Sequence, residues 1–231
     1  SAEGGGRRES GSKARGRVVV AFSGFERNEH ANRLNRLVGQ LRGSVEEDTA
    51  SLAAHATHVV VARPVKRTAK LCIALSLPRA VLVGEEWLTA CESAGSFVDV
   101  TPYLLAGEHT SQPGAASAWA FNATTSRKRA AADGPACLAG LTFVVTPATK
   151  PKPSELRMII EAAGGTVVDK APKEAKGAGG VGSSVVVSTE EERRLWVPLL
   201  KRGLVGVRPE VLLSCVMRQE WRVGEGEGLG A

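Results

Sequence analysis

Short runs of consecutive apolar residues alternate along the chain with longer segments in which apolar residues recur three or four positions apart. Arg17–Phe22 and Leu141–Thr146 are runs of the first kind, and Glu29–Leu41 and Pro153–Ala163 are segments of the second kind. A spacing of three and four places apolar side chains on one face of a helix, whereas a short continuous run is typical of a strand buried on both faces. The alternation predicts an α/β fold in which helices cover both faces of a parallel sheet.

The pattern occurs twice. Residues 81–91 resemble residues 205–215, and Thr57–Val61 matches Ser183–Val187. Each copy is predicted to run strand, helix, brief strand, loop, strand, helix, strand and helix, and the first helix of each copy ends at glycine, namely Gly43 or Gly164–Gly165. Two similar copies predict two domains. We expect residues 17–105 and 138–223 each to form a four-stranded parallel sheet flanked by helices, with the two domains packed in tandem through helices.

The remaining segments are predicted to be tails and a linker. Residues 1–16 and 224–231 are rich in glycine and polar residues and are expected to be disordered tails. Residues 106–137 are expected to link the copies, with a short helix over Ala123–Ala132 and with Trp119 and Phe121 packed against the repeats. Gly177-x-Gly179-x-x-Gly182 has the spacing of a dinucleotide fingerprint, but a strand follows it where a helix is required, so we interpret it as a loop.

Composition narrows the function classes. The formal net charge of +6 favours acidic partners, either phosphorylated segments or nucleic acid. No apolar stretch is long enough to span a membrane, and the first residues lack the apolar core of a signal peptide. The four cysteines form no CxxC pair, so we expect buried, reduced thiols in a cytosolic or nuclear protein. A zinc site from His55, His58 and two cysteines fits no finger spacing. The four histidines fit no nucleophile or metal signature, so we expect no catalytic residue, no metal and no cofactor.

Cations gather where a helix is predicted to begin. Arg63, Lys66, Arg67 and Lys70 lie at the start of the predicted helix Thr68–Leu77. A helix N-terminus carries partial positive charge, so cations there are unfavourable unless an anion also binds. The equivalent helix of the second copy opens with the ordinary acidic residues, Glu190–Glu192. The contrast predicts an anion site in the first copy only.

Ser23 and Gly24 follow the first strand and suit the same anion. The serine hydroxyl can donate to a phosphate oxygen, and glycine allows its amide to approach closely. Lys70 adds a point charge, and Arg67 can bind a carboxylate with two parallel donors. The second copy has Thr146-Pro147 at the matching place, and proline has no amide to offer.

These residues resemble the BRCT family. The resemblance rests on Trp87-x-x-x-Cys91 in the last helix, with Gly95 and Phe97 after it, and it covers Arg17–Val223; the second copy has Val211 in place of the tryptophan. The chain is also similar to the tandem BRCT pairs of DNA damage checkpoint mediators, in the segments Phe22-Ser23-Gly24, Arg67-Thr68-Ala69-Lys70, Val145-Thr146-Pro147 and Gly164-Gly165-Thr166.

This resemblance implies a phosphopeptide reader. Ser23, Gly24 and Lys70 would hold the phosphate, and the peptide residue three positions later would lie in the groove between the repeats. Arg67 would grip the free C-terminal carboxylate of a phosphorylated histone tail. Pro147 and Lys150 would complete that pocket from the second repeat.

Alternatives remain open at this stage. The pair could read internal phosphosites of another repair protein, bind DNA as a secondary activity, or serve as an accessory region of a repair enzyme. Arg127-Lys128-Arg129 could be a nuclear localisation patch or a solvated linker. We expect a monomeric, nuclear protein whose partner is a phosphorylated tail.

Overall fold

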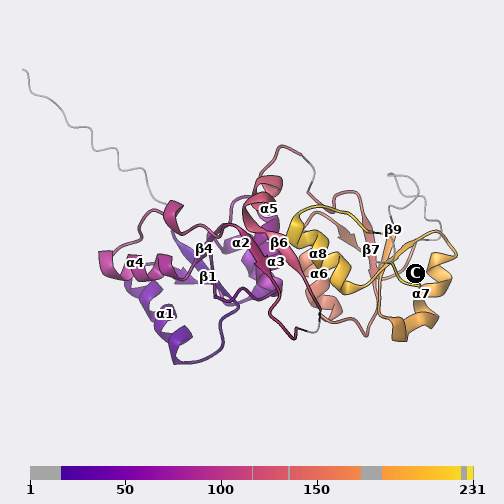
Figure 1. Cartoon of the computed structure of the whole chain (residues 1–231), viewed down its shortest axis with the longest axis horizontal. Coiled ribbons are helices and arrows are strands. Elements are labelled where there is room, and N and C mark those ends of the chain that lie inside the picture. Colours follow the sequence, from indigo (N-terminus) through magenta and orange to yellow (C-terminus); the bar gives the residue numbers. More distant parts are fainter. Residues whose placement is uncertain (1–16, 116, 135, 173–183, 225–227, 231) are drawn as a thin grey trace, which may run out of the picture.

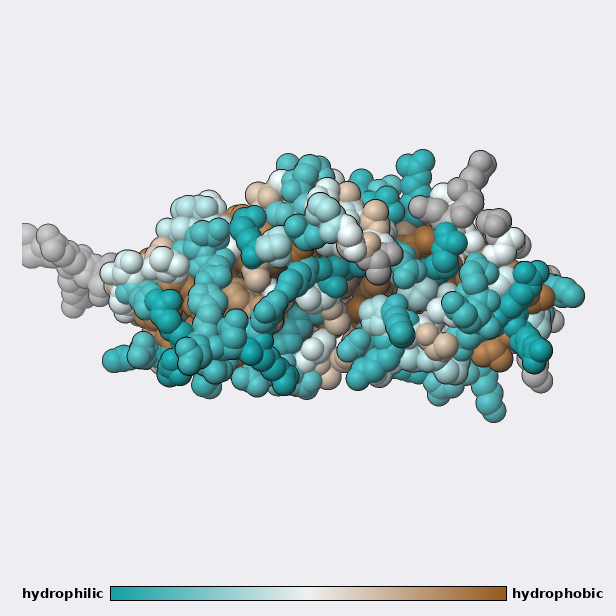
Figure 2. Space-filling model, turned by 60° about the horizontal axis from the view of Figure 1, so that its bottom comes forward, coloured by the Kyte–Doolittle hydropathy of each residue, from teal (hydrophilic) through white to brown (hydrophobic). Residues whose placement is uncertain are grey.

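The computed structural model describes residues 17–115, 117–134, 136–172, 184–224 and 228–230. Two sheets with their helices lie one after the other along the long axis of the molecule (Figure 1). Figure 2 shows a face that is mostly hydrophilic, with apolar patches between the polar residues. No helix in the described ranges is long and apolar enough to cross a membrane. The predicted tail 1–16 and the glycine segment Gly177–Gly182 lie outside the described residues.

The first sheet is parallel and has the strand order β2-β1-β3-β4. Its strands are β1 (Val19–Ser23), β2 (Ser44–Val45), β3 (His58–Val61) and β4 (Val81–Gly84). Helices α1 (Glu29–Gln40) and α4 (Glu86–Ala94) bury apolar residues on one face, and α2 (Thr49–His55) and α3 (Ala69–Ser76) bury theirs on the other. Trp87 of α4 lies in the core that α1 and α4 form on the first face, where its ring stacks on those of His58 and Phe97.

The second sheet repeats this order with β8-β7-β9-β10. Its strands are β7 (Thr142–Val145), β8 (Thr166–Val167), β9 (Ser184–Val187) and β10 (Val205–Val207). Helices α6 (Pro153–Ala162) and α8 (Pro209–Arg218) cover the face toward the first repeat, whereas η2 (Glu190–Glu192) and α7 (Arg193–Leu200) lie on the other side (Figure 1). The predicted fold class is therefore confirmed.

Helices join the two repeats, as predicted. Helix α3 of the first repeat packs against α6 and α8 of the second, and a single apolar core runs through this interface. Within it Gln219 donates a hydrogen bond to the hydroxyl of Ser76 at 2.8 Å, and both side chains are buried. An apolar interface with a satisfied polar pair fixes the relative orientation of the repeats.

The segment between the repeats is more ordered than the sequence analysis predicted. A hairpin of β5 (Glu108–Thr110) and β6 (Ala120–Asn122) follows the one-turn helix η1 (Thr101–Tyr103) and leads into α5 (Ala123–Ala130). Phe121 is 2% exposed and Trp119 packs beside it against the shared core, as expected from the sequence. The hairpin itself was not predicted.

Arg127 of α5 explains why this segment is held firmly. Its guanidinium donates to five backbone carbonyls at the C-terminal end of α3 and the turn into β4, those of Ala74, Leu75, Leu77, Pro78 and Ala80. A cation at a helix C-terminus satisfies carbonyls that lack partners within the helix. Arg129 likewise binds the Arg218 carbonyl and the Glu220 carboxylate. Two of the three basic residues expected to form a solvated or localisation patch therefore have structural partners.

Sheet register corrects one detail of the repeat. In the first sheet His58 is paired with Val20 on one side and with Val81 on the other. In the second sheet Val185 is paired in the same way with Phe143 and Val205. His58 therefore matches Val185 and not Ser184, and Ser23 matches Thr146 as predicted. Because each copy has three consecutive valines, the sequence alone could not distinguish alignments that differ by one residue.

Two other segments differ from expectation. Helix α2 occupies a stretch predicted to be a loop, because a helix of seven residues capped by Asp48 has too few turns to produce a visible apolar period. In the predicted C-terminal tail, Gly228 bridges to Val207, and Leu229 is 5% exposed with its amide bonded to Gly206. Residues 228–230 thus cover the edge strand β10.

All four cysteines are free thiols. Burial raises the pKa of Cys72 and of Cys137 to about 12, which keeps both thiols protonated and unreactive. The described residues contain no group of three histidine, cysteine or acidic side chains placed to hold a metal. Of the two histidines considered as zinc ligands, His55 pairs with Glu46 and His58 stacks on Trp87.

Candidate anion-binding site

The candidate site begins where β1 ends beside the N-terminus of α3. Pairing of Ser23 with Val61 brings the end of β1 next to the loop that leads into α3. The hydroxyls of Ser23 and Thr68 share a hydrogen bond of 2.8 Å, and Thr68 also caps α3 by accepting from the Leu71 amide at 3.1 Å. Thr68 was not predicted as a site residue, since only the fold brings it to Ser23. Ser23 is 1% exposed, so its side chain is buried at this junction of β1 with the N-terminus of α3, which we call the corner.

Gly24 gives the corner a backbone donor. Its φ of +85° lies in the left-handed region that favours glycine, so a side chain here would strain the turn. The Gly24 amide has no hydrogen-bond acceptor among the described residues. The turn therefore leaves a backbone N–H group without an acceptor next to Ser23.

Lys70 lies in the first turn of α3, where the helix dipole disfavours a cation. Burial lowers the pKa of its ammonium, while the nearby carboxylates of Glu47, Glu46 and Asp48 act in the opposite direction. Its Nζ has one protein acceptor, the Glu46 carbonyl, at 3.5 Å. An ammonium that is half-buried and so weakly bound can accept an anionic ligand.

The other predicted cations divide into two kinds. Lys66 pairs with Glu26 at 3.2 Å and Arg63 with Glu86 at 3.3 Å, and all four side chains are largely exposed. Such surface pairs contribute little and need no ligand. By contrast, neither Lys70 nor Arg67 forms an ion pair with any residue that the structure describes.

Arg67 lies between three parts of the molecule. It precedes the cap of α3, its Nη2 donates to Ser117 Oγ of the linker at 2.8 Å, and Glu210 at the start of α8 interacts with it electrostatically. Its Nη1 is buried and has no acceptor within the described residues. Burial lowers the pKa of this guanidinium, although arginine remains charged under all ordinary conditions. A buried donor without an acceptor is costly and is rare outside functional sites.

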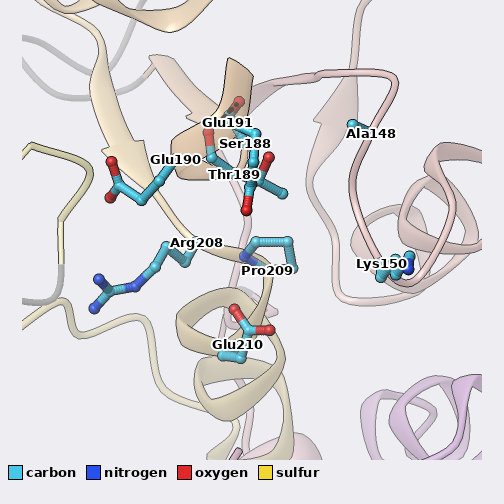
Figure 3. Close-up of a pocket in the computed structure, with 9 residues that line it drawn as sticks. All are labelled: Ala148, Lys150, Ser188, Thr189, Glu190, Glu191, Arg208, Pro209 and Glu210. Atoms are coloured by element: carbon cyan, nitrogen blue, oxygen red, sulfur yellow. Dashed lines mark hydrogen bonds between the residues drawn. The ribbon is translucent and has the colours of Figure 1, made fainter. Parts of the chain in front are cut away.

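Residues predicted from the second repeat are placed differently. Lys150 is exposed and lines a pocket of the second repeat with Glu190, Glu191 and Glu210, at the ends of β9 and β10 (Figure 3). Glu210, which borders this pocket, also interacts electrostatically with Arg67. Pro147 is exposed in the turn after β7 and does not line the pocket. The structure thus places Ser23 and Gly24 at the end of β1 beside Thr68, the cap of α3. Lys70 lies in the first turn of that helix and Arg67 just before its cap, whereas Pro147 and Lys150 lie on the second repeat.

The matching corner of the second repeat contains an anion of the chain's own. The carboxylate of Glu192 accepts hydrogen bonds from the Thr146 hydroxyl and from the Ala148 amide, the latter at 3.0 Å. The Ser188 hydroxyl lies 3.4 Å from Glu192 Oε2, the oxygen that also accepts from Thr146. Thr146 matches Ser23 in sheet register. At this position the second repeat bonds a carboxylate, whereas Ser23 bonds none among the described residues.

Comparisons with known proteins agree with this architecture. Residues 136–222 match the model of the BRCT domain family. The Bos taurus PAX-interacting protein 1 is 29% identical over 205 residues, which are 87% of this chain and 19% of that protein. The Homo sapiens Mediator of DNA damage checkpoint protein 1 is 29% identical over 201 residues, which are 87% of this chain and 9% of that protein. The chain spans less than a fifth of the length of the curated relatives it matches.

Solved structures show the same fold. The crystal structure of the S. pombe Brc1 BRCT5-BRCT6 domains has a TM-score of 0.63 and 19% sequence identity, covering 93% of this chain and 97% of that one. The complex of Rtt107p and phosphorylated histone H2A has a TM-score of 0.58 and 10% identity, covering 92% of each chain.

Proposed function

Since the chain is a tandem pair of BRCT repeats, we propose that it binds phosphorylated peptides through the first repeat, as a recognition module of a nuclear DNA damage response protein. The phosphate would bind Ser23, the Gly24 amide and Lys70. We assign no catalytic role to any residue. The partner we propose is a phosphorylated histone tail whose phosphoserine lies near a free C-terminus.

One observation carries this proposal: the second repeat fills the equivalent corner with the Glu192 carboxylate. In the second repeat this strand end therefore bonds an anionic group. In the first repeat no described carboxylate occupies the corner, while Lys70 stands at the helix start in place of an acidic residue. An external phosphate would supply the missing anion and would offset both the buried ammonium and the helix dipole.

The histone-tail assignment rests on Arg67 and on the relatives. A guanidinium with one buried donor unused suits a planar carboxylate, which accepts two parallel hydrogen bonds. A solved structure of Rtt107p, which shares the fold, is its complex with phosphorylated histone H2A. Similarity to Mediator of DNA damage checkpoint protein 1 supports a nuclear, chromatin-associated setting.

Fluorescence anisotropy with one labelled peptide tests the phosphate site. A peptide with phosphoserine near its free C-terminus is compared with its unphosphorylated form, and Lys70→Met and Ser23→Ala are compared with the parent chain. Charge-assisted hydrogen bonds to phosphate contribute about 1.5–3 kcal/mol each, so each variant should bind at least about tenfold more weakly. Exposed Lys201→Met and Ser93→Ala are the matched controls and should bind like the parent. Undiminished binding by Lys70→Met would overturn the proposal.

A further inference from the structure

An apolar groove lies at the opposite end of α3 from the anion-binding corner. Its volume is about 620 Å³, and its apolar lining includes Val81, Leu82, Pro102, Leu104, Leu105 and Ala131. Leu104 is 46% exposed, and among the described residues only Leu195 is another large hydrophobic side chain so exposed. Exposed apolar hollows of this size commonly bind ligands or partner segments.

The groove offers side chains and not backbone groups to a partner. The Leu82 carbonyl accepts from the Leu105 amide at 2.9 Å, and Leu104 bridges to Val83, so this edge of β4 is already covered. The carbonyls of Pro78 and Ala80 are bonded to Arg127. A partner strand therefore cannot extend the sheet here, and an occupant must insert apolar side chains.

Charge selects the kind of occupant. The lining contains two cations, Arg127 and Lys128, and no carboxylate. Arg127 is committed to backbone carbonyls, but Lys128 is exposed and has no ion-pair partner within the described residues. Arg79 lies between Pro78 and Ala80, which both line the groove. It is exposed and likewise forms no ion pair with the described part of the chain. An apolar floor with a cationic rim complements an apolar segment that carries acidic residues.

Segments of this chain outside the described residues have the wrong composition to fill the groove. Residues 1–16 contain Arg7, Arg8, Lys13 and Arg15 but no leucine, isoleucine, valine, methionine or aromatic residue. Residues 173–183 contain a single large apolar side chain, Val181. These segments are therefore poorly suited to fill the groove.

We propose that this groove docks a short segment of a partner protein in which two or more bulky apolar side chains are flanked by aspartate or glutamate. The apolar side chains insert between β4 and α5, and the acidic residues face Lys128 and Arg79. The two ends of α3 then serve different ligands, with phosphate at the N-terminus and an acidic apolar segment at the C-terminus. Docking does not depend on phosphorylation or on Lys70.

Selection from a random library tests both the place and the chemistry. Phage displaying 16-residue random peptides are panned on the full chain, with counter-selection on the Leu104→Glu variant. Enriched sequences should combine bulky apolar residues with an excess of aspartate and glutamate. Failure to recover sequences that distinguish the chain from Leu104→Glu, or recovery of basic or uncharged ones, would overturn the proposal.

Variants then locate the binding of the enriched peptide. Leu104→Glu and Lys128→Glu should each weaken it at least about tenfold, because one places a carboxylate in the apolar floor and the other reverses the rim charge. Leu195→Glu, at the similarly exposed leucine of α7, and Lys70→Met should leave it unchanged. Loss of binding in Leu195→Glu equal to that in Leu104→Glu would reject the groove. A dimer by light scattering that Leu104→Glu abolishes would assign the groove to a second copy of the chain and overturn the separate partner.

Discussion

Gln219 and Ser76 lie 143 residues apart in sequence and share a buried hydrogen bond of 2.8 Å across the interface between the repeats. Gln219 ends α8 with a φ of +52°, and Ser76 is the last residue of α3. The pair therefore joins the ends of two helices that pack against each other across the interface between the repeats.

Ser76→Ala should lower the free energy of unfolding by about 1–3 kcal/mol, because it leaves the buried Gln219 amide with one acceptor fewer. Urea denaturation of Ser76→Ala, Gln219→Ala and the double variant measures their coupling. Exposed Ser93→Ala, which loses only a bond within its own helix, should change stability by less than about 0.5 kcal/mol. Strictly additive losses would show that the two side chains do not stabilise each other.

Arg67 distinguishes a reader of chain ends from a general phosphopeptide reader. A phosphopeptide that ends two or three residues after its phosphoserine should bind better as a free acid than as an amide. Arg67→Gln should remove that difference while preserving the preference for phosphate, because glutamine lacks the paired cationic donors. Anisotropy with both peptides measures the ratio, and exposed Arg79→Gln should keep it. Equal affinity of the parent chain for acid and amide would contradict the histone-tail assignment.

Glu192 should be structural and not part of the ligand site. Glu192→Ala removes the acceptor of the Thr146 hydroxyl and the Ala148 amide, so unfolding should become easier by about 1–3 kcal/mol. Phosphopeptide affinity should be unchanged if the phosphate binds the first repeat, as proposed. Chemical denaturation and anisotropy measure the two effects, with the neighbouring exposed Glu190→Ala as control. Reduced phosphopeptide binding without loss of stability would contradict the division of roles.

Arg127 should stabilise the linker more than its basic neighbours do. Arg127→Ala leaves several carbonyls at the end of α3 without their donor, and a cost of at least about 2 kcal/mol is expected in thermal or urea unfolding. Lys128→Ala, one position away and exposed, should cost less than about 0.5 kcal/mol. Similar losses in the two variants would mean that the carbonyl contacts do not hold the linker.

Acid should destabilise the first repeat through His58. Burial lowers the pKa of this imidazole, which stacks on the Trp87 ring with 4.8 Å between the ring centroids. Below the usual histidine pKa of about 6.5 the unfolded chain takes up a proton that the folded chain resists, so stability is present above that pH and falls as pH drops. Urea denaturation between pH 7 and pH 5 should show a smaller decline in His58→Phe than in the parent. An identical decline in both would exclude His58 as a source.

The sequence alone determined the repeated strand–helix order and the parallel sheets, and it predicted an anion site in the first copy only. Apolar periodicity reports burial directly, and the cations near Lys70 stand out against the acidic residues of Glu190–Glu192 because helix starts have a general charge preference. Short or local features such as α2 and the β5–β6 hairpin carry no such period, so they could not be predicted.

Tertiary structure decided every contact that joins distant parts of the chain. Only the fold brings Ser23 to Thr68, places Glu192 in the second corner and leaves one donor of Arg67 unused beside Ser117. It also places Arg127, which was expected to be a surface cation, at the C-terminal end of α3, where it bonds the last carbonyls of the helix. Composition and periodicity describe each residue's preference for water or apolar surroundings, whereas a hydrogen bond requires two particular atoms to meet, and their meeting depends on the packing of the whole chain.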